Sequence, residues 1–173
     1  VDEALLKKFK KHRYFKKRPP KSTGREDFGA SYAETIYHDY QNYNQGKLPD
    51  LLATLTRLTA WSIVDSYRRY LPAWPDEVIL CGGGADNPTL VEMIKEELAI
   101  PAPGKRTPTV YRIDDLGIPN KAKEAASFAL LAAATMDGIP ANVPAVTGAE
   151  HPTILGVVAT PNYPSKSVRG PRR

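Results

Sequence analysis

The chain has 173 residues, of which 42% are hydrophobic and 25% charged, so it is long enough for one domain with a buried core. No run of about 18 apolar residues occurs, which excludes a membrane-spanning helix. Cys81 is the only cysteine and the three histidines are scattered, so the sequence offers neither a disulfide nor a metal-ligand spacing. We therefore expect a cytoplasmic protein with no membrane partner.

The net charge of +5 comes from the two ends of the chain. Residues 1–21 hold nine Lys and Arg residues against two acidic ones, residues 166–173 hold four Lys and Arg residues and no acid, and the body between them is mildly acidic. A basic tail can follow a phosphate backbone, but a solvated helix face and a frayed end explain the same charges. We expect no nucleic-acid partner. The predicted organisation is a basic helix and linker over 1–20, a folded lobe over 21–160 and a basic disordered tail over 161–173.

Apolar periodicity predicts three helices in the first half of the chain. The first begins after Asp2 as N-cap and ends before Pro19-Pro20, the second spans about 29–43 and stops at Gly46, and the third spans about 50–71 with Asp50 as N-cap. The residues at helical spacing are Leu5, Leu6 and Phe9 in the first, Tyr32, Ile36 and Tyr40 in the second, and Leu51, Leu55, Leu58, Trp61 and Val64 among others in the third.

Strands and helices alternate in the second half. A strand over 77–81 leads through a glycine loop into a helix that opens with Asn87 as N-cap and Pro88 in its first turn. A second strand is expected at 109–113, followed by an alanine-rich helix over 121–137 that packs on the sheet and stops at Gly138. "TILGVVA" is expected to form a third strand or a buried edge segment. The sequence therefore predicts an α/β, helix-rich fold with an incomplete sheet.

Three interpretations compete for the consecutive glycines Gly82, Gly83 and Gly84. Glycine at the end of a strand permits a positive φ and a close helix–sheet approach without any ligand. A dinucleotide fingerprint fails because Asp86 and Asn87 stand where its last glycine belongs, and a phosphate-binding loop fails for want of its Gly-Lys-Ser/Thr ending. The remaining functional interpretation is a loop at the carboxyl end of a strand whose missing side chains let a flat or sugar-like ligand lie against the backbone.

Three stretches then point to a family. "CGGGADNPTLVEMI" resembles the adenosine-binding motif of the anhydro-N-acetylmuramic acid kinases and the related levoglucosan kinases of the actin-like ATPase superfamily. "PPKSTGREDF" and "GIPNKAKEAASFALLAAATMDGIPANVPAVTGA" resemble further motifs of that family in the same order. The resemblance covers most of residues 14–160 and corresponds to the C-terminal part of such a kinase. The family's phosphate hairpin and the segment with its catalytic aspartate are not found in this sequence.

The resemblance implies a fold and a chemistry. The chain would be the C-terminal lobe of an actin-like (ribonuclease H-like) sugar kinase, with residues 21–160 as the nucleotide-binding lobe. The complete enzyme would use ATP and Mg2+ to phosphorylate a 1,6-anhydro sugar while water opens the ring, as a homodimer that recycles cell-wall amino sugars. Gly82, Gly83 and Gly84 would pack against adenosine with Asn87 as a polar contact, and Glu124 would face the sugar or the attacking water. No catalytic base or metal ligand is expected in this chain, so we expect it to be inactive alone.

Structural explanations stay open beside these roles. Asn87 can serve only as a helix cap, and Glu124 only as a dipole partner in the first turn of a helix. "KSTGRE" can form a capping box from Ser22 or Thr23 with Glu26, or Arg25 can reach the cleft. Asp114 and Asp115 are expected to cap a loop. The alternative function is a non-enzymatic nucleotide- or partner-binding module derived from the same fold.

Overall fold

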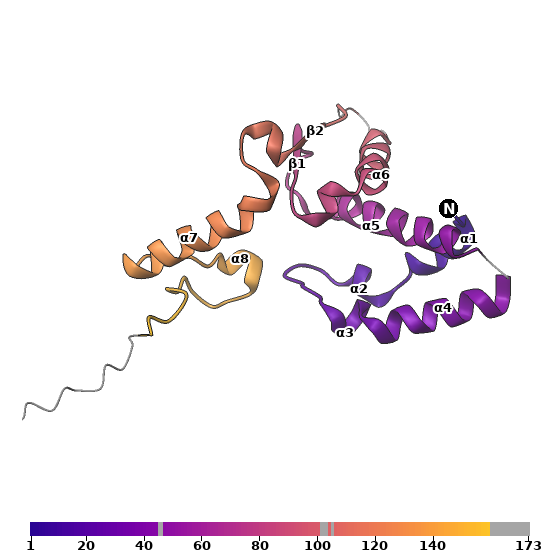
Figure 1. Ribbon diagram of the computed structural model, residues 1–173, viewed down its shortest axis with the longest axis horizontal. Coiled ribbons are helices and arrows are strands. Elements are labelled where there is room, and N and C mark those ends of the chain that lie inside the picture. The colour runs from indigo at the N-terminus through magenta and orange to yellow at the C-terminus, as the bar shows by residue number, and fades with distance from the viewer. Residues whose placement is uncertain (45–46, 101–103, 105, 160–173) are drawn as a thin grey trace, which may run out of the picture.

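The computed structural model describes residues 1–44, 47–100, 104 and 106–159, and it is α/β and helix-rich (Figure 1). The strands β1 (Glu77–Leu80) and β2 (Thr109–Arg112) form a two-stranded parallel sheet, which confirms the predicted class. The helices are α1 (Glu3–Phe9), α2 (Arg13–Lys16), α3 (Arg25–Phe28), α4 (Ala30–Asn44), α5 (Leu48–Tyr70), α6 (Pro88–Ala99), α7 (Lys123–Met136) and α8 (Pro144–Thr147). Short 3-10 turns follow the strands: η1 (Gly83–Asp86), η2 (Ile113–Leu116) and η3 (Asn120–Ala122).

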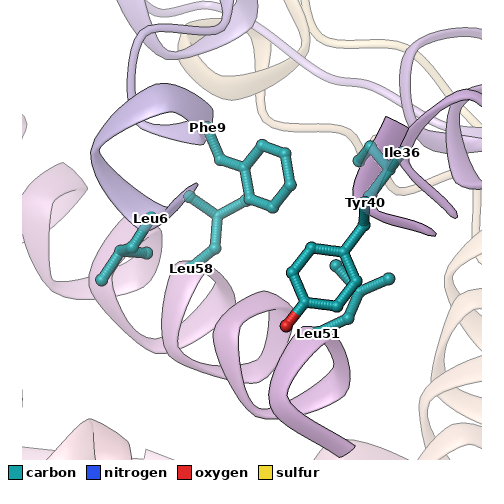
Figure 2. Close-up of a cluster of buried hydrophobic side chains, with 6 residues drawn as sticks. All are labelled: Leu6, Phe9, Ile36, Tyr40, Leu51 and Leu58. Carbon is teal, nitrogen blue, oxygen red and sulfur yellow. The ribbon is translucent and has the colours of Figure 1, made fainter. Parts of the chain in front are cut away.

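The long helix α5 lies between two hydrophobic clusters. One cluster joins it to α1 and α4, and Figure 2 shows its six buried side chains facing one another. The other joins it to β1 and α6. Burial of each Leu, Ile, Phe or Met side chain stabilises the fold by about 1.5–3 kcal/mol. Because α5 contributes to both clusters, it is the helix against which α1, α4, β1 and α6 pack. The clusters are Leu6, Phe9, Ile36, Tyr40, Leu51 and Leu58, and Ala60, Val64, Val78, Met93, Ile94 and Leu98.

The two strands and α6 form a parallel crossover unit. The register pairs Glu77 with Thr109 and Leu80 with Arg112, so both strands end at the same edge of the sheet. α6 connects them and buries its apolar side against α5 and β1. Because the carboxyl ends of the strands are adjacent, the segments that follow them, 81–87 and 113–122, start side by side. In parallel sheets this edge is where ligands bind.

The predicted end of the first helix needs correction. Asp2 caps α1 as expected, since its carboxylate accepts the N–H of Leu5 at 2.9 Å. The helix nevertheless ends at Phe9, well before the two prolines, because the backbone at His12 is not helical (φ −54°, ψ 139°) and His12 starts the separate helix α2 by accepting the N–H of Tyr14. This break lets Phe15 stack edge-on against Trp61 of α5. Gly46, the expected stop of α4, lies outside the described residues.

Asp50 is not the N-cap of α5. The helix begins earlier, at Leu48, with Lys47 at the cap position and Pro49 in the first turn. Proline prefers this place because its fixed φ suits the helix and its missing N–H costs nothing there. Asp50 therefore lies inside the first turn, where a carboxylate interacts favourably with the helix dipole.

The prediction that the alanine-rich helix packs on the sheet is wrong. α7 projects away from β1 and β2 in Figure 1, and it has no buried residue. Phe128, Leu130 and Met136 are 70%, 73% and 71% exposed. The expected third strand or buried edge segment is wrong as well, because residues 153–159 form neither helix nor strand and are exposed, Val157 to 93%. This segment runs along α7 instead, where Thr135 donates a hydrogen bond to the Leu155 carbonyl.

Two further expectations concern membrane-spanning helices and the C-terminal tail. None of the helices in the described ranges is both long and apolar enough to cross a membrane. The basic tail expected at 161–173 lies outside the described residues.

Candidate functional site

The glycine loop connects β1 to α6 at the carboxyl edge of the sheet. Gly82 has φ +81°, a left-handed conformation that side chains rarely adopt, so glycine is required there by the backbone. Gly83 and Gly84 begin the turn η1 and have no such φ. The first, purely structural interpretation therefore explains Gly82 and leaves its two neighbours unexplained.

Packing does not require the second and third glycines either. A Cβ added at Gly83 would meet nothing within 4 Å, and one at Gly84 would meet only the Leu90 methyl at 3.4 Å, an ordinary contact distance. Both residues are exposed. The backbone of Gly83 and Gly84 thus faces open space on the side where side chains would stand, which is the arrangement a ligand lying against the backbone needs.

Asn87 is the N-cap of α6, as predicted. Its side-chain oxygen accepts the N–H of Leu90 at 3.2 Å, and its own N–H donates to the Gly84 carbonyl at 3.2 Å. Pro88 occupies the first turn. The cap role is confirmed, and a contact of Asn87 with a ligand stays a prediction.

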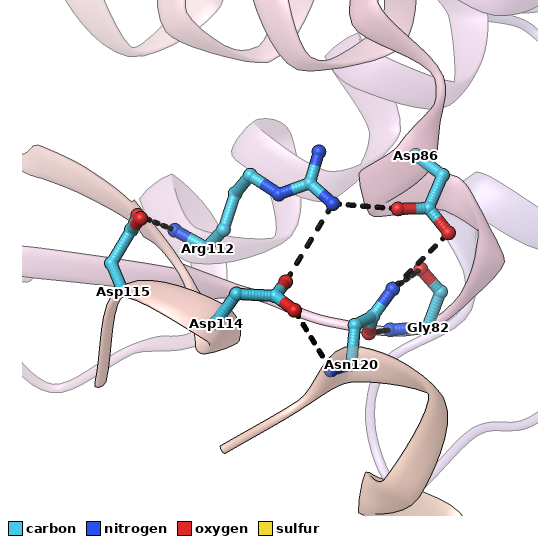
Figure 3. Close-up of polar contacts among 6 residues, drawn as sticks. All are labelled: Gly82, Asp86, Arg112, Asp114, Asp115 and Asn120. Carbon is cyan, nitrogen blue, oxygen red and sulfur yellow. Dashed lines mark hydrogen bonds and ion pairs between the residues drawn. The ribbon is translucent and has the colours of Figure 1, made fainter. Parts of the chain in front are cut away.

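The side chain of Asn120, in the segment that follows β2, fixes the glycine loop. Figure 3 shows the amide of Asn120 lying against Gly82, where it accepts the Gly82 N–H at 2.6 Å and donates to the Gly82 carbonyl at 3.1 Å. The same amide nitrogen lies 3.3 Å from a carboxylate oxygen of Asp86. The Gly82 carbonyl also accepts the N–H of Ala85 at 3.0 Å, so the Asn120 amide is the partner of the Gly82 N–H and the second partner of its carbonyl, and it holds the loop where it leaves β1.

Four charged residues, Asp86, Arg112, Asp114 and Asp115, surround this contact and form with Asn120 what we call the ring. Arg112, the last residue of β2, donates to Asp86 at 2.6 Å and lies 3.6 Å from Asp114. Asp114 also accepts the N–H of Asn120 at 3.0 Å, and Asp115 accepts the N–H of Arg112 at 2.7 Å. The hydrogen bond to Asp86 raises the pKa of Arg112, and the Asn120 N–H lowers the pKa of Asp114. Asp114 and Asp115 therefore cap the loop, as expected.

These carboxylates are poorly placed to bind a metal. Both oxygens of Asp86 and both oxygens of Asp114 already have partners in Arg112 and Asn120. No group of three or more His, Cys, Asp or Glu residues suited to a metal ion occurs within the described ranges. The contacts of Arg112 and Asn120 with these carboxylates make the ring a clamp for the glycine loop.

Glu124 lies in the first turn of α7, about one helical turn after Asn120. Its side chain is exposed, and in the described part of the chain it has no hydrogen-bond or ion-pair partner. In this it differs from the carboxylates of the ring. Glu124 thus follows β2 in the chain, as does Asn120, which clamps the glycine loop. The contact of Glu124 with a substrate stays a prediction.

"KSTGRE" has a local structural role that differs in detail from the predicted capping box. Glu26 accepts the N–H of Gly24 at 2.8 Å, but Thr23 donates its hydroxyl to Asp27 at 3.1 Å, and the cap position of α3 is Gly24. The Thr23 hydroxyl is the main cause of a lowered pKa of Asp27. Arg25 is exposed.

Sequence reasoning missed Asn120, Arg112 and Asp86. Each follows or ends a strand segment at the carboxyl edge, and this position was the available signal. The partners are 26 to 38 residues apart in the chain, so no local pattern pairs them.

Comparison with known proteins decides the family. The sequence model of the family described as anhydro-N-acetylmuramic acid kinase matches residues 1–161. The chain belongs to the anhydro-N-acetylmuramic acid kinase family. It is 45% identical over 162 residues to a kinase of this name from Cyanothece sp., over 94% of this chain and 40% of that relative.

Two further relatives with the same name agree. The protein from Caldanaerobacter subterraneus subsp. tengcongensis is 41% identical over 161 residues, which are 92% of this chain and 39% of the relative. That from Synechococcus elongatus is 40% identical over 159 residues, 91% of this chain and 39% of the relative. The chain thus spans about two fifths of the length of the curated relatives it matches, and the anhydro-N-acetylmuramic acid kinase match includes the glycine loop, the ring and α7.

Proposed function

We propose that this chain is the C-terminal, nucleotide-binding lobe of an ATP-dependent kinase of 1,6-anhydro sugars with an actin-like fold. Family membership supports the reaction class. The observation that carries the role of this part is the open backbone at Gly83 and Gly84, which neither φ nor packing explains. Adenosine is the ligand proposed there, with its base and ribose against the two glycines.

The residues present fit ATP better than they fit a metal ion. A flat base can approach a backbone that lacks Cβ atoms, and the loop lies at the edge where parallel sheets bind ligands. Mg2+, which would neutralise the phosphates during transfer, finds no free carboxylate pair in the ring, since Asp86 and Asp114 are engaged. We propose that the groups acting on the phosphates belong to the part of the relatives that this chain does not match.

Glu124 is proposed to face the sugar side of the site. Hydrolytic opening of an anhydro ring needs water to be oriented at the anomeric carbon while the freed sugar oxygen receives the phosphoryl group. The exposed carboxylate of Glu124, which has no partner among the described residues, can orient a sugar hydroxyl or that water. Its place shortly after Asn120 links this role to the nucleotide loop.

The surface of α7 supports the proposal that this part works within a larger assembly. A helix with apolar residues on all sides is normally buried, yet Phe128, Leu130 and Met136 are mostly exposed. Exposed apolar surface of this extent marks a contact area. We propose that further kinase structure covers it, that the complete protein forms a homodimer, and that it acts in the cytoplasm in recycling cell-wall amino sugars.

Calorimetric titration of the 173-residue chain with ATP tests the nucleotide role. We expect saturable binding with a Kd below about 1 mM, which corresponds to about −4 kcal/mol. Millimolar or absent binding would leave the adenosine role without support. In a parallel assay, phosphorylation of anhydro-N-acetylmuramic acid and of levoglucosan by the chain alone should be undetectable. Turnover would contradict the claim that essential groups lie elsewhere.

A further inference from the structure

The Asn120 side chain connects two parts of the molecule. In the described part of the chain, the hydrogen bonds that run from residues 117–158 to residues 1–112 come from its amide, which contacts Gly82 and Asp86. Other side-chain bonds of the C-terminal segment stay within it, such as those of Asn142 with His151 and Thr153. α7 itself has no buried residue. Gly148, after α8, also packs near Pro20, but at the start of α7 the polar link to the sheet edge is this one amide.

We infer that Asn120 is a positioning residue that fixes the glycine loop and the start of α7 to each other. The inference deepens the proposed function and rests on it, because it gives the adenosine side of the site, at Gly83 and Gly84, and its sugar side, at Glu124, one common anchor.

The chemistry of the contact requires an amide. Gly82 offers one donor and one acceptor to Asn120, and only a group that both accepts and donates satisfies the two. An aspartate at this position could still accept the Gly82 N–H. It would lose the bond to the Gly82 carbonyl and would place a second carboxylate beside Asp86. A small apolar residue would remove the Asn120 partner of the Gly82 N–H, whereas the Gly82 carbonyl would keep the N–H of Ala85 at 3.0 Å.

The ring around Asn120 sets the direction of its amide. Asp114 accepts the backbone N–H of Asn120 at 3.0 Å, and Arg112 bridges Asp114 and Asp86. Asp114 thus holds the backbone of Asn120 while Gly82 and Asp86 hold its amide, before any ligand arrives. Such preorganisation lowers the entropic cost of binding, since the loop need not be ordered by the nucleotide.

Hydrogen exchange of the 15N-labelled chain tests the anchor directly. In Asn120→Ala the Gly82 amide should exchange at least tenfold faster than in the wild type, while the Val91 amide of α6, bonded to the Asn87 carbonyl, should keep its rate. Asn120→Asp should give an intermediate rate at Gly82. Asn142→Ala, which removes a comparable pair of bonds elsewhere, is the matched control and should leave Gly82 unchanged. An unchanged Gly82 rate in Asn120→Ala would overturn the inference.

A second readout follows the orientation of α7. Cys81, the only cysteine, is exposed and adjoins Gly82, so it accepts a nitroxide label. Paramagnetic broadening of the amides near Glu124 should fall at least twofold in Asn120→Ala and stay the same in Asn142→Ala. Unchanged broadening in Asn120→Ala would mean that other contacts orient the helix and would overturn the inference.

ATP titration separates the anchor from the proposed function. If the wild type binds ATP, Asn120→Ala should bind it at least tenfold more weakly, and equal affinity would overturn the positioning role. If the wild type does not bind ATP, the proposed function fails for this chain, whereas exchange at Gly82 and broadening near Glu124 still decide whether Asn120 is the anchor.

Discussion

Replacing Gly83 with valine should weaken nucleotide binding without harming the fold. The new Cβ would meet nothing within 4 Å, and the backbone there is not left-handed, so no clash or strain is expected. Replacing a glycine reduces the conformational entropy of the unfolded chain, which stabilises the folded protein by about 0.4–1 kcal/mol where the native conformation suits the new residue. The free energy of unfolding should therefore stay within about 1 kcal/mol of the wild type.

The valine methyls would project into the space proposed for adenosine. We expect ATP affinity to fall at least tenfold, equivalent to about 1.4 kcal/mol or more. Gly82→Ala is the matched contrast, since a side chain at φ +81° and ψ −179° costs about 1–3 kcal/mol of stability. Urea unfolding followed by the fluorescence of Trp61 and Trp74, together with calorimetry, measures both quantities.

Either of two results would refute this reasoning. If Gly83→Val lost more than about 2 kcal/mol of stability, the open space at Gly83 would be filled in the native protein. If it bound ATP as tightly as the wild type, the nucleotide would not lie against this glycine.

Three further predictions concern packing and charge. The side chain of Glu97 is 8% exposed and lies between Arg57 and Arg68, so Glu97→Ala should lower the free energy of unfolding by about 2 kcal/mol. The loss is smaller than for a wholly buried ion pair because both arginines stay partly solvated. Glu96→Ala, which removes the exposed partner of Arg57, should lower it by under about 1 kcal/mol in the same urea titration. Leu98→Ala should cost about 2–5 kcal/mol, whereas Phe128→Ala should change stability by less than about 0.5 kcal/mol; a large loss at Phe128 would show that α7 is packed in the isolated chain. The lowered pKa of Asp114 means that its stabilising effect is present above the ordinary carboxylate range and is lost as the pH falls below about 4. Asp114→Asn should therefore show a smaller loss of stability between pH 5 and pH 3 than the wild type, and equal losses would contradict the assignment.

Local signals predicted the elements that local chemistry determines. The N-caps Asp2 and Asn87 were readable because a short polar side chain stands just before an apolar helical pattern. The strands over 77–81 and 109–113 were found within a residue of their observed ends. At α5 the cap assignment failed because Pro49 tolerates the first turn and lets the helix begin before Asp50.

Long-range contacts were beyond the sequence. Asn120 meets Gly82 across 38 residues, and only the parallel pairing of β1 and β2 brings their following segments together. The exposure of α7 was equally unpredictable, because an apolar pattern says that a helix needs a neighbour and not which segment supplies it. The same holds for residues 153–159, which we expected to be a third strand or a buried edge segment but whose backbone pairs with no strand in the described part of the chain.

Titration of the 15N-labelled chain with adenosine shows directly whether the nucleoside lies against Gly83 and Gly84. We expect the amides of Gly83 and Gly84 to show the largest shifts, saturating together with that of Asn87. Gly83→Val should abolish these shifts while the spectrum of the rest of the protein stays that of the folded chain. Saturable adenosine binding that leaves Gly83 and Gly84 unshifted, or that survives Gly83→Val unchanged, would contradict this placement of the nucleoside.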